Sequence, residues 1–289
     1  MKDTDITEPL FREAVDVLRW GNASAMKALL DTHPELVRDR LITPQEDGYF
    51  KDPYLLWFIA DNPILKGSLP ANIAEVAAVI IEAIKREAPD SCQFQLDYAL
   101  GLVVTGRIPR ECGVQIALMD LLIDEGATAG SGVGALAHGN EAAARHLIKR
   151  GGPLTLTTAV CLNEQDEVNR LLPTSRDEER QTALVAAAFY ANTGMLTLLI
   201  NAGVNVNVYP TANSGFHSHA TALHQAVYSG SLEAVKLLTE AGADLSLPDK
   251  VYQGTPLGWA MYMQSEESPD DTTKLKYAAI EAYLRSLDK

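Results

Sequence analysis

The sequence has few cysteines, and their spacing limits what they can do. The 289 residues contain three, and they are far apart along the chain: Cys92, Cys112 and Cys161. A disulfide framework requires pairs, and a zinc site requires clustered ligands, so neither is indicated. We expect three free thiols, buried or half-buried, in the reducing environment of the cytoplasm.

Cations and long apolar runs are also scarce. Lys and Arg total 24 against 38 Asp and Glu, which gives a formal net charge of −14. Such a surface repels phosphate backbones and anionic lipid, so we expect no nucleic-acid partner and no membrane partner. No stretch has about 18 apolar residues without a charge, and the start, MKDTDITEPL, lacks the apolar centre of a signal peptide. A cytoplasmic location is the expectation.

Sequence signatures of catalysis are missing as well. The motifs HExxH, G-x-S-x-G and CxxC and the kinase signatures do not occur. GSGVGA at 130–135 matches a dinucleotide-binding pattern formally, but that site needs a preceding strand and a later acidic residue. The preceding IALMDLLIDEG has the pattern of a helix instead. We therefore predict no enzymatic activity and no cofactor.

What the chain does contain is an apolar triplet at i, i+3 and i+4 that recurs throughout. This spacing lines one face of a helix, and each such helix is too short to be stable alone. Four of them are followed by a glycine suited to a left-handed C-cap. The triplets are 25/28/29, 76/79/80, 118/121/122, 143/146/147, 168/171/172, 195/198/199, 234/237/238 and 280/283/284, and the glycines are Gly126, Gly151, Gly203 and Gly242.

A second, shorter helix is predicted before each triplet helix. Thr221 is expected to cap one such helix and Thr182 another, and each lies 21 residues before a C-cap glycine, Gly242 or Gly203. The acidic run at 177–179, just before Thr182, is expected to be a solvated loop. The pattern is that of a helix-turn-helix unit repeated in tandem, which forms a solenoid.

The residues of these units resemble ankyrin repeats. The matching segments are TALH at 221–224, Gly230, Leu237-Leu238 and Gly242-Ala243-Asp244, then TAL at 182–184, and then GTPLGWA at 254–260. The last of these resembles the closing repeat of many bacterial ankyrin proteins. The resemblance implies an all-α ankyrin-repeat solenoid of about eight helix-turn-helix units, with short β-hairpin fingers in some repeats.

The whole chain, 1–289, is predicted to be a single solenoid of unequal parts. Triplets only 25–27 residues apart leave no room for a finger in the middle of the chain, and wider spacings place inserted loops elsewhere. The expected parts are divergent repeats with insertions at 1–126, short fingerless repeats at 127–180, typical repeats at 181–262 and a C-terminal cap at 263–289. The expected insertions are 41–53, 61–70, 107–113 and 208–220.

The resemblance also implies a binding surface, the concave groove at the ends of the first helices. Positions that match the groove residues of the family include an aromatic stripe, and aromatic residues are typical of recognition surfaces. We expect Tyr190, Tyr228 and Tyr262 to be exposed there, and Phe189 less so. The candidate partner-binding residues are His138, Phe189, Tyr190, Tyr228, Tyr262, His217 and His219.

Two histidines in the 208–220 insertion allow two interpretations. His217 and His219 would point to the same side of an extended strand, and with His224 they could form a zinc site. His224, however, lies at the T-x-L-H position, where the resemblance implies a hydrogen-bonding link between neighbouring loops. We favour this second interpretation and predict no metal.

Together these features predict a non-catalytic scaffold or adaptor, a monomer that binds another protein through the concave ankyrin groove. The alternative is a small-ligand binder or enzyme that uses the inserted loops around 41–70 and 107–113. Five aromatic residues gather in the first of these loops, and they are expected mainly to seal the irregular N-terminal repeats: Tyr49, Phe50, Tyr54, Trp57 and Phe58.

Overall fold

The fold is helical wherever it is described. The computed structural model describes residues 5–43, 47–61, 67–211, 215–267 and 270–287. None of these residues lies in a β-strand, and no helix among them is long and apolar enough to cross a bilayer. The predicted all-α class is confirmed for this part of the chain, whereas the β-hairpin fingers and the number of repeats stay predictions.

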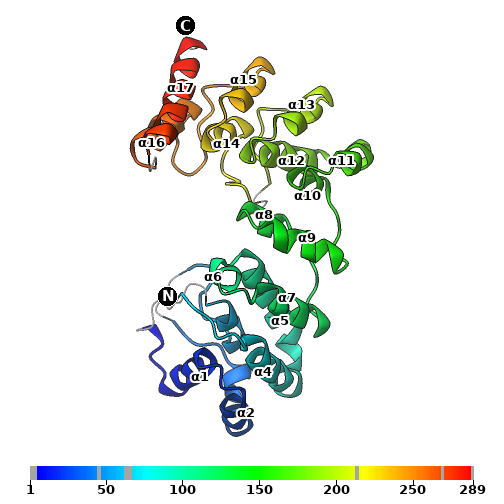
Figure 1. The fold of residues 1–289 in the computed structure, drawn as a ribbon, viewed down its shortest axis with the longest axis vertical. Coiled ribbons are helices and arrows are strands. Elements are labelled where there is room, and N and C mark those ends of the chain that lie inside the picture. Colours follow the sequence, from blue (N-terminus) through cyan, green and yellow to red (C-terminus); the bar gives the residue numbers. More distant parts are fainter. Residues whose placement is uncertain (1–4, 44–46, 62–66, 212–214, 268–269, 288–289) are drawn as a thin grey trace. The chain divides into compact units, whose positions relative to one another are not determined.

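Two compact units make up the chain (Figure 1), and the first comprises residues 1–130 and 142–152. Its centre is the 3-10 helix η2, whose sequence LLWFIA is apolar throughout and whose side chains are all buried. This helix packs against α1, α4 and α5. The helices of the unit are α1 (Pro9–Arg19), α2 (Ala23–Thr32), α3 (Glu35–Arg38), η2 (Leu55–Ala60), α4 (Ile73–Glu87), α5 (Pro89–Thr105), α6 (Arg107–Glu111), α7 (Gln115–Asp124) and, apart from its first residue, α9 (Glu141–Lys149).

The aromatic residues of the 41–70 insertion mostly seal this unit, as expected. Phe50, Trp57 and Phe58 are buried, and Phe58 contacts Phe11 of α1 with ring centroids 5.6 Å apart. Tyr49, by contrast, is exposed. The 107–113 insertion is not a loop throughout, since it contains α6, which begins right after Gly106.

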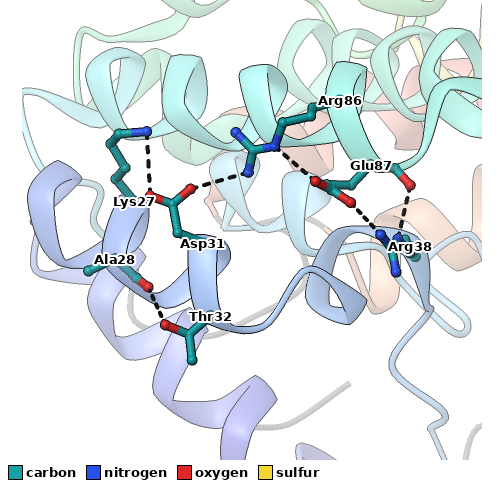
Figure 2. Close-up of polar contacts among 7 residues, drawn as sticks. All are labelled: Lys27, Ala28, Asp31, Thr32, Arg38, Arg86 and Glu87. Carbon is teal, nitrogen blue, oxygen red and sulfur yellow. Dashed lines mark hydrogen bonds and ion pairs between the residues drawn. The ribbon is translucent and has the colours of Figure 1, made fainter.

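Surface ion pairs connect α2, α3 and α4 (Figure 2). The Asp31 carboxylate lies 3.2 Å from the Arg86 guanidinium, which also donates to Glu87 at 2.9 Å. Glu87 pairs with Arg38 of α3 as well, and its backbone carbonyl accepts a hydrogen bond from Arg38 Nε at 3.0 Å. Hydrogen bonds from Arg86 and Arg38 lower the pKa of Glu87. Because these groups face water, each pair contributes little to the stability of the unit.

The second unit comprises residues 131–141 and 153–289 and contains two rows of helices. α12, α14 and α16 pack one on the next, and so do α13, α15 and α17 (Figure 1). Each helix of the first row is followed in the chain by one of the second. The helices are α8 (Val133–Ala137), α10 (Leu156–Cys161), α11 (Gln165–Leu171), η3 (Leu172–Thr174), α12 (Asp177–Phe189), α13 (Thr193–Asn201), α14 (Ala222–Tyr228), α15 (Leu232–Glu240), α16 (Pro256–Ser265) and α17 (Asp271–Leu287).

Burial follows the predicted triplets in seven of the eight cases. In those seven, the first and third residues are buried and the middle one is half-buried, as with Ala234, Leu237 and Leu238. The 25/28/29 triplet is wrong, because α2 buries Met26 and Leu30 instead. Those two are also four residues apart, and their side chains offer more apolar area to bury than the two alanines of the predicted triplet.

Helix ends are predicted well at the C-terminus and less well at the N-terminus. Gly126, Gly151, Gly203 and Gly242 all have positive φ, between 80° and 114°, as a left-handed C-cap requires. Thr182 is not a cap, because α12 begins five residues earlier and the Thr182 hydroxyl donates to the Glu178 carbonyl inside the helix at 2.9 Å.

The 177–179 run, expected to be a loop, is the first turn of α12. Its three carboxylates lie at the positive end of the helix dipole, where negative charge favours the helix. A run of like charges therefore extends this helix instead of ending it.

The three cysteines are free, and Cys161 is buried while Cys92 and Cys112 are half-buried. This confirms the expectation of free thiols. Burial raises the pKa of the Cys161 thiol far above its usual range. Cys161 is therefore a small apolar core residue and not a nucleophile.

Candidate protein-binding surface

Aromatic side chains of successive first-row helices meet in the second unit. Phe189 is the last residue of α12 and Tyr228 the last of α14. Because α12 and α14 pack side by side, the two rings stack, with centroids 5.6 Å apart and planes 18° apart. Tyr190, next along the chain, lies against Phe189 at 5.5 Å.

The loop before α14 adds a histidine to this stack. The His217 ring meets the Tyr228 ring edge to face, with centroids 4.6 Å apart. Phe216 is buried beneath it and contacts Phe189 at 5.3 Å. Both Phe216 and His217 have φ near 50°, a conformation that costs energy for residues other than glycine. Packing of the two rings holds the backbone there.

Residues of the next repeat continue the row of rings. Trp259 of α16 lies 6.1 Å from His217 and 6.0 Å from His219, measured between ring centroids. Tyr252 contacts His219 at 5.8 Å. We call this continuous series the aromatic strip; it consists of Tyr190, Phe189, Tyr228, His217, Trp259, His219 and Tyr252.

A buried aspartate holds the last part of the aromatic strip in place. The Asp249 carboxylate accepts hydrogen bonds from the backbone N–H of Val251, Tyr252 and Gly254, and from Trp259 Nε1 at 3.0 Å. Burial opposes its ionisation, but these hydrogen bonds outweigh that effect and lower its pKa to about 2. The ionised carboxylate thus ties the 249–254 turn to α16.

The candidate residues differ in how far their side chains are exposed to a partner. Tyr228 is 37% exposed and Tyr262 is 56% exposed, whereas Phe189 is half-buried. Tyr190 is also half-buried, contrary to expectation, and its hydroxyl donates to the Leu136 carbonyl at 2.6 Å. Burial raises the pKa of Tyr190 to about 12. Tyr190 therefore helps to fix α12 on α8 as well as extending the aromatic strip.

Two candidate residues lie apart from the aromatic strip. His138 is exposed, and its Nδ1 donates to the Gly134 carbonyl at 2.9 Å. The Tyr262 hydroxyl lies 3.3 Å from the Glu267 carboxylate, whose charge raises the pKa of Tyr262. Within the described residues neither ring packs on a ring of the aromatic strip, although Tyr252 is near enough to Tyr262 to contribute to raising its pKa.

The histidines do not form a three-ligand site. His224 Nδ1 accepts the N–H of Thr221 at 3.3 Å, and His224 Nε2 donates to the Gly254 carbonyl at 3.0 Å. Both ring nitrogens are thus used, and His224 links neighbouring loops as the resemblance implied. Burial lowers the pKa of His224 and of His217, which keeps both rings neutral at physiological pH. Among the described residues, no three His, Cys, Asp or Glu side chains are placed to hold a metal ion.

Sequence reasoning missed two members of the aromatic strip, Tyr252 and Trp259, and the buried Phe216 that packs against Phe189. Phe216 follows residues 212–214, which are not described, and no periodicity marks it. Tyr252 and Trp259 could have been found, since Asp249 precedes Gly254 at a spacing that suits a turn closed by an aspartate side chain. Tyr252 is 77% exposed, more than any of the predicted tyrosines.

Helix pairs stacked in two rows, joined by loops that hydrogen-bond to their neighbours, define a helical repeat protein. Residues 129–249 match the family model described as ankyrin repeats (3 copies), so this part of the chain is similar to ankyrin repeats. The match includes five residues of the aromatic strip, Phe189, Tyr190, His217, His219 and Tyr228, and ends before Tyr252 and Trp259.

Two individual proteins are similar to parts of the chain. The zinc finger CCCH domain-containing protein 50 of Oryza sativa subsp. japonica is 44% identical over 80 residues, which are 26% of this chain and 11% of that protein. The crystal structure of the human ASB11 ankyrin repeat domain aligns over 73% of this chain and 98% of its own, at 18% identity and a TM-score of 0.33. The first likeness covers only about a tenth of the plant protein.

Proposed function

We propose that this chain is a non-catalytic scaffold or adaptor that binds another protein through the aromatic strip of its second unit. Ankyrin repeats are generally protein-interaction modules, and the match of residues 129–249 to the ankyrin-repeat model supports the proposal. The observation that carries the proposal is the aromatic strip itself, in which rings from three successive repeats meet.

Several properties of the aromatic strip suit recognition. Tyr228 and Tyr252 are exposed, while stacking and hydrogen bonds hold the strip in place. Large rings that are already fixed lose little conformational entropy when a partner binds, which is why tyrosine and tryptophan dominate binding energy at interfaces. Tyr262 and His138 belong to the proposal as outer contacts on the same unit.

We also propose a cellular location, an oligomeric state and a partner charge for the chain. We place it in the cytoplasm as a monomer with no nucleic-acid, membrane or cofactor requirement. The acidic balance, −14 overall, favours a neutral or basic protein partner. A single repeat array over 1–289 also stays a prediction.

The test is quantitative capture of partners from the native host with matched variants. Tyr228→Ala combined with Tyr252→Ala should remove the captured protein, and the interaction should then be measured with both proteins purified. Leu275→Ala is the control, because Leu275 is 70% exposed on α17 and lies outside the aromatic strip. We expect a Kd at least about tenfold weaker for the double variant and no change for the control.

Two results would contradict this function. One is a folded Tyr228→Ala/Tyr252→Ala variant that binds the identified partner as tightly as the unaltered protein does. The other is an equal loss of binding in Leu275→Ala, which would place the contact elsewhere on the unit. Circular dichroism and the unfolding midpoint of each variant separate lost binding from lost folding.

A further inference from the structure

A cation lies among three aromatic rings in the first unit. The Arg40 guanidinium carbon is 4.8 Å from the ring centroid of Tyr54, 5.6 Å from that of Trp57 and 5.4 Å from that of Phe94. We call these three rings the aromatic cage. They belong to a different unit from the aromatic strip, so a role for the aromatic cage is independent of the proposed function.

The three rings form a corner around the cation. Tyr54 and Trp57 meet at 75°, Tyr54 and Phe94 at 71°, and Trp57 and Phe94 at 63°. Their centroids are 5.5–6.4 Å apart, so a single positive group can face all three rings at once. Each ring face carries partial negative charge, and the attractions of the three add.

Packing from behind keeps the aromatic cage in shape. Trp57 is 2% exposed and stacks on Tyr98 with centroids 4.0 Å apart. Tyr54 is buried as well, whereas Phe94 is 46% exposed and forms the outer wall. The Arg40 side chain is exposed, with its guanidinium over the three rings. The rings would therefore stay in place if Arg40 moved away.

The chemistry of the aromatic cage suits a cation without N–H groups. A guanidinium has five N–H bonds to satisfy, but in the described part of the chain Arg40 contributes no side-chain hydrogen bond or ion pair. The three ring faces offer these N–H groups no oxygen acceptor, so the cage itself holds Arg40 by charge alone. A quaternary ammonium group has no N–H bonds and loses none of them when it enters.

We propose that the aromatic cage is a binding site for a quaternary or fully N-methylated ammonium group, and that Arg40 is its resident occupant. Arg40 turns out into water when such a cation enters. The ligand class is defined by its head group, which a small metabolite or a methylated lysine of a partner protein can each present. Arg40 lowers the apparent affinity because it competes for the same ring faces.

The experiment is a titration of the full chain with tetramethylammonium chloride, followed by the N-methyl proton resonance. Ring faces shift that resonance upfield, which a non-specific surface interaction does not. Arg40→Ala should bind with a Kd at least about tenfold lower than the unaltered protein, because the competing cation is gone. Adding Phe94→Leu to Arg40→Ala should abolish the saturable shift, because the outer wall is removed.

Arg38→Ala is the matched control, since Arg38 is two residues away and pairs with Glu87. It should behave as the unaltered protein does. Methylammonium, which has three N–H bonds, should bind Arg40→Ala at least about tenfold more weakly than tetramethylammonium does. If Arg40→Ala does not fold by circular dichroism, Arg40→Gln takes its place, because it keeps the aliphatic stem over the rings.

Three outcomes would overturn the inference. No saturable upfield shift in the folded Arg40 variant would mean that the rings are only packed against one another. Equal affinity of the variant and the unaltered protein would show that Arg40 does not compete. Equal binding of methylammonium and tetramethylammonium would remove the argued preference for cations without N–H bonds. By contrast, a trimethyllysine peptide that binds no more tightly than tetramethylammonium would support the head group as the recognised feature.

Discussion

Replacing Leu238 with alanine tests the register of the repeat helices. Leu238 is fully buried, the third residue of its triplet in α15, while Leu237 beside it is half-buried. Leu238→Ala removes three carbons, about 2.4 kcal/mol of transfer free energy at ~0.8 kcal/mol each. The cavity adds about 1 kcal/mol, giving a loss of about 3–4 kcal/mol, within the range of known Leu→Ala substitutions.

Leu237→Ala is the matched control on the same helix turn. It changes helix propensity by the same amount, but water can fill the space that it leaves. We expect a loss of about 1 kcal/mol, because roughly half of the transfer free energy is involved. The difference of about 2–3 kcal/mol between two adjacent leucines is the quantity under test.

The assay is urea unfolding of protein labelled with 5-fluorotryptophan. The three tryptophans are Trp20, Trp57 and Trp259, and only Trp259 belongs to the second unit. Its fluorine resonance, assigned with Trp259→Phe, reports the unfolding of the unit that contains α15. A loss from Leu237→Ala equal to or larger than that from Leu238→Ala would refute the register.

Three further predictions concern single polar groups. The pKa of Asp249 is about 2 in the folded protein and should rise in Trp259→Phe, which removes the indole hydrogen bond. The free energy of unfolding of the unaltered protein should fall as pH drops from about 4 to about 2, because protonation of Asp249 in this range removes the stabilisation that its depressed pKa provides. A pH titration by NMR checks both, and an unchanged Asp249 pKa in the variant would contradict the indole hydrogen bond. Tyr190→Phe should cost about 1 kcal/mol in unfolding free energy, since it removes the hydrogen bond to Leu136 and leaves that carbonyl without its partner, and no change in urea would count against it. Cys161 should react with a thiol reagent only on unfolding, so modification of the native protein at Cys161 would be inconsistent with its burial.

The recurring triplet made most of the second unit predictable from the sequence. Periodicity identifies a helix face because burial of apolar area drives both folding and the pattern. It separated buried from half-buried positions less well, since Leu237 and Leu238 are both leucines and only packing against neighbouring helices distinguishes them. Thr182 resembles a cap because threonine often caps helices, but the acidic residues before it continue α12.

The candidate surface was predictable in part. The repeat register predicts Phe189 and Tyr228 at equivalent positions, and the structure brings them into contact. Tyr252 and Trp259 join the aromatic strip because the Asp249 carboxylate accepts hydrogen bonds from both, an arrangement that periodicity does not predict. The aromatic cage was even harder to predict from the sequence, because Arg40 and Phe94 are far apart in the chain.

The sequence by itself determined the all-α class, the positions of the C-cap glycines and the similarity of 129–249 to ankyrin repeats, because local periodicity and capping depend on residues within a few turns of one another. The tertiary structure decided which rings touch. It linked the half-buried Tyr190 to Leu136 of α8 and placed Arg40 among three rings of the first unit. Contacts of this kind depend on how loops and helices that are distant in the chain pack against one another. The order of the residues alone is compatible with more than one such packing.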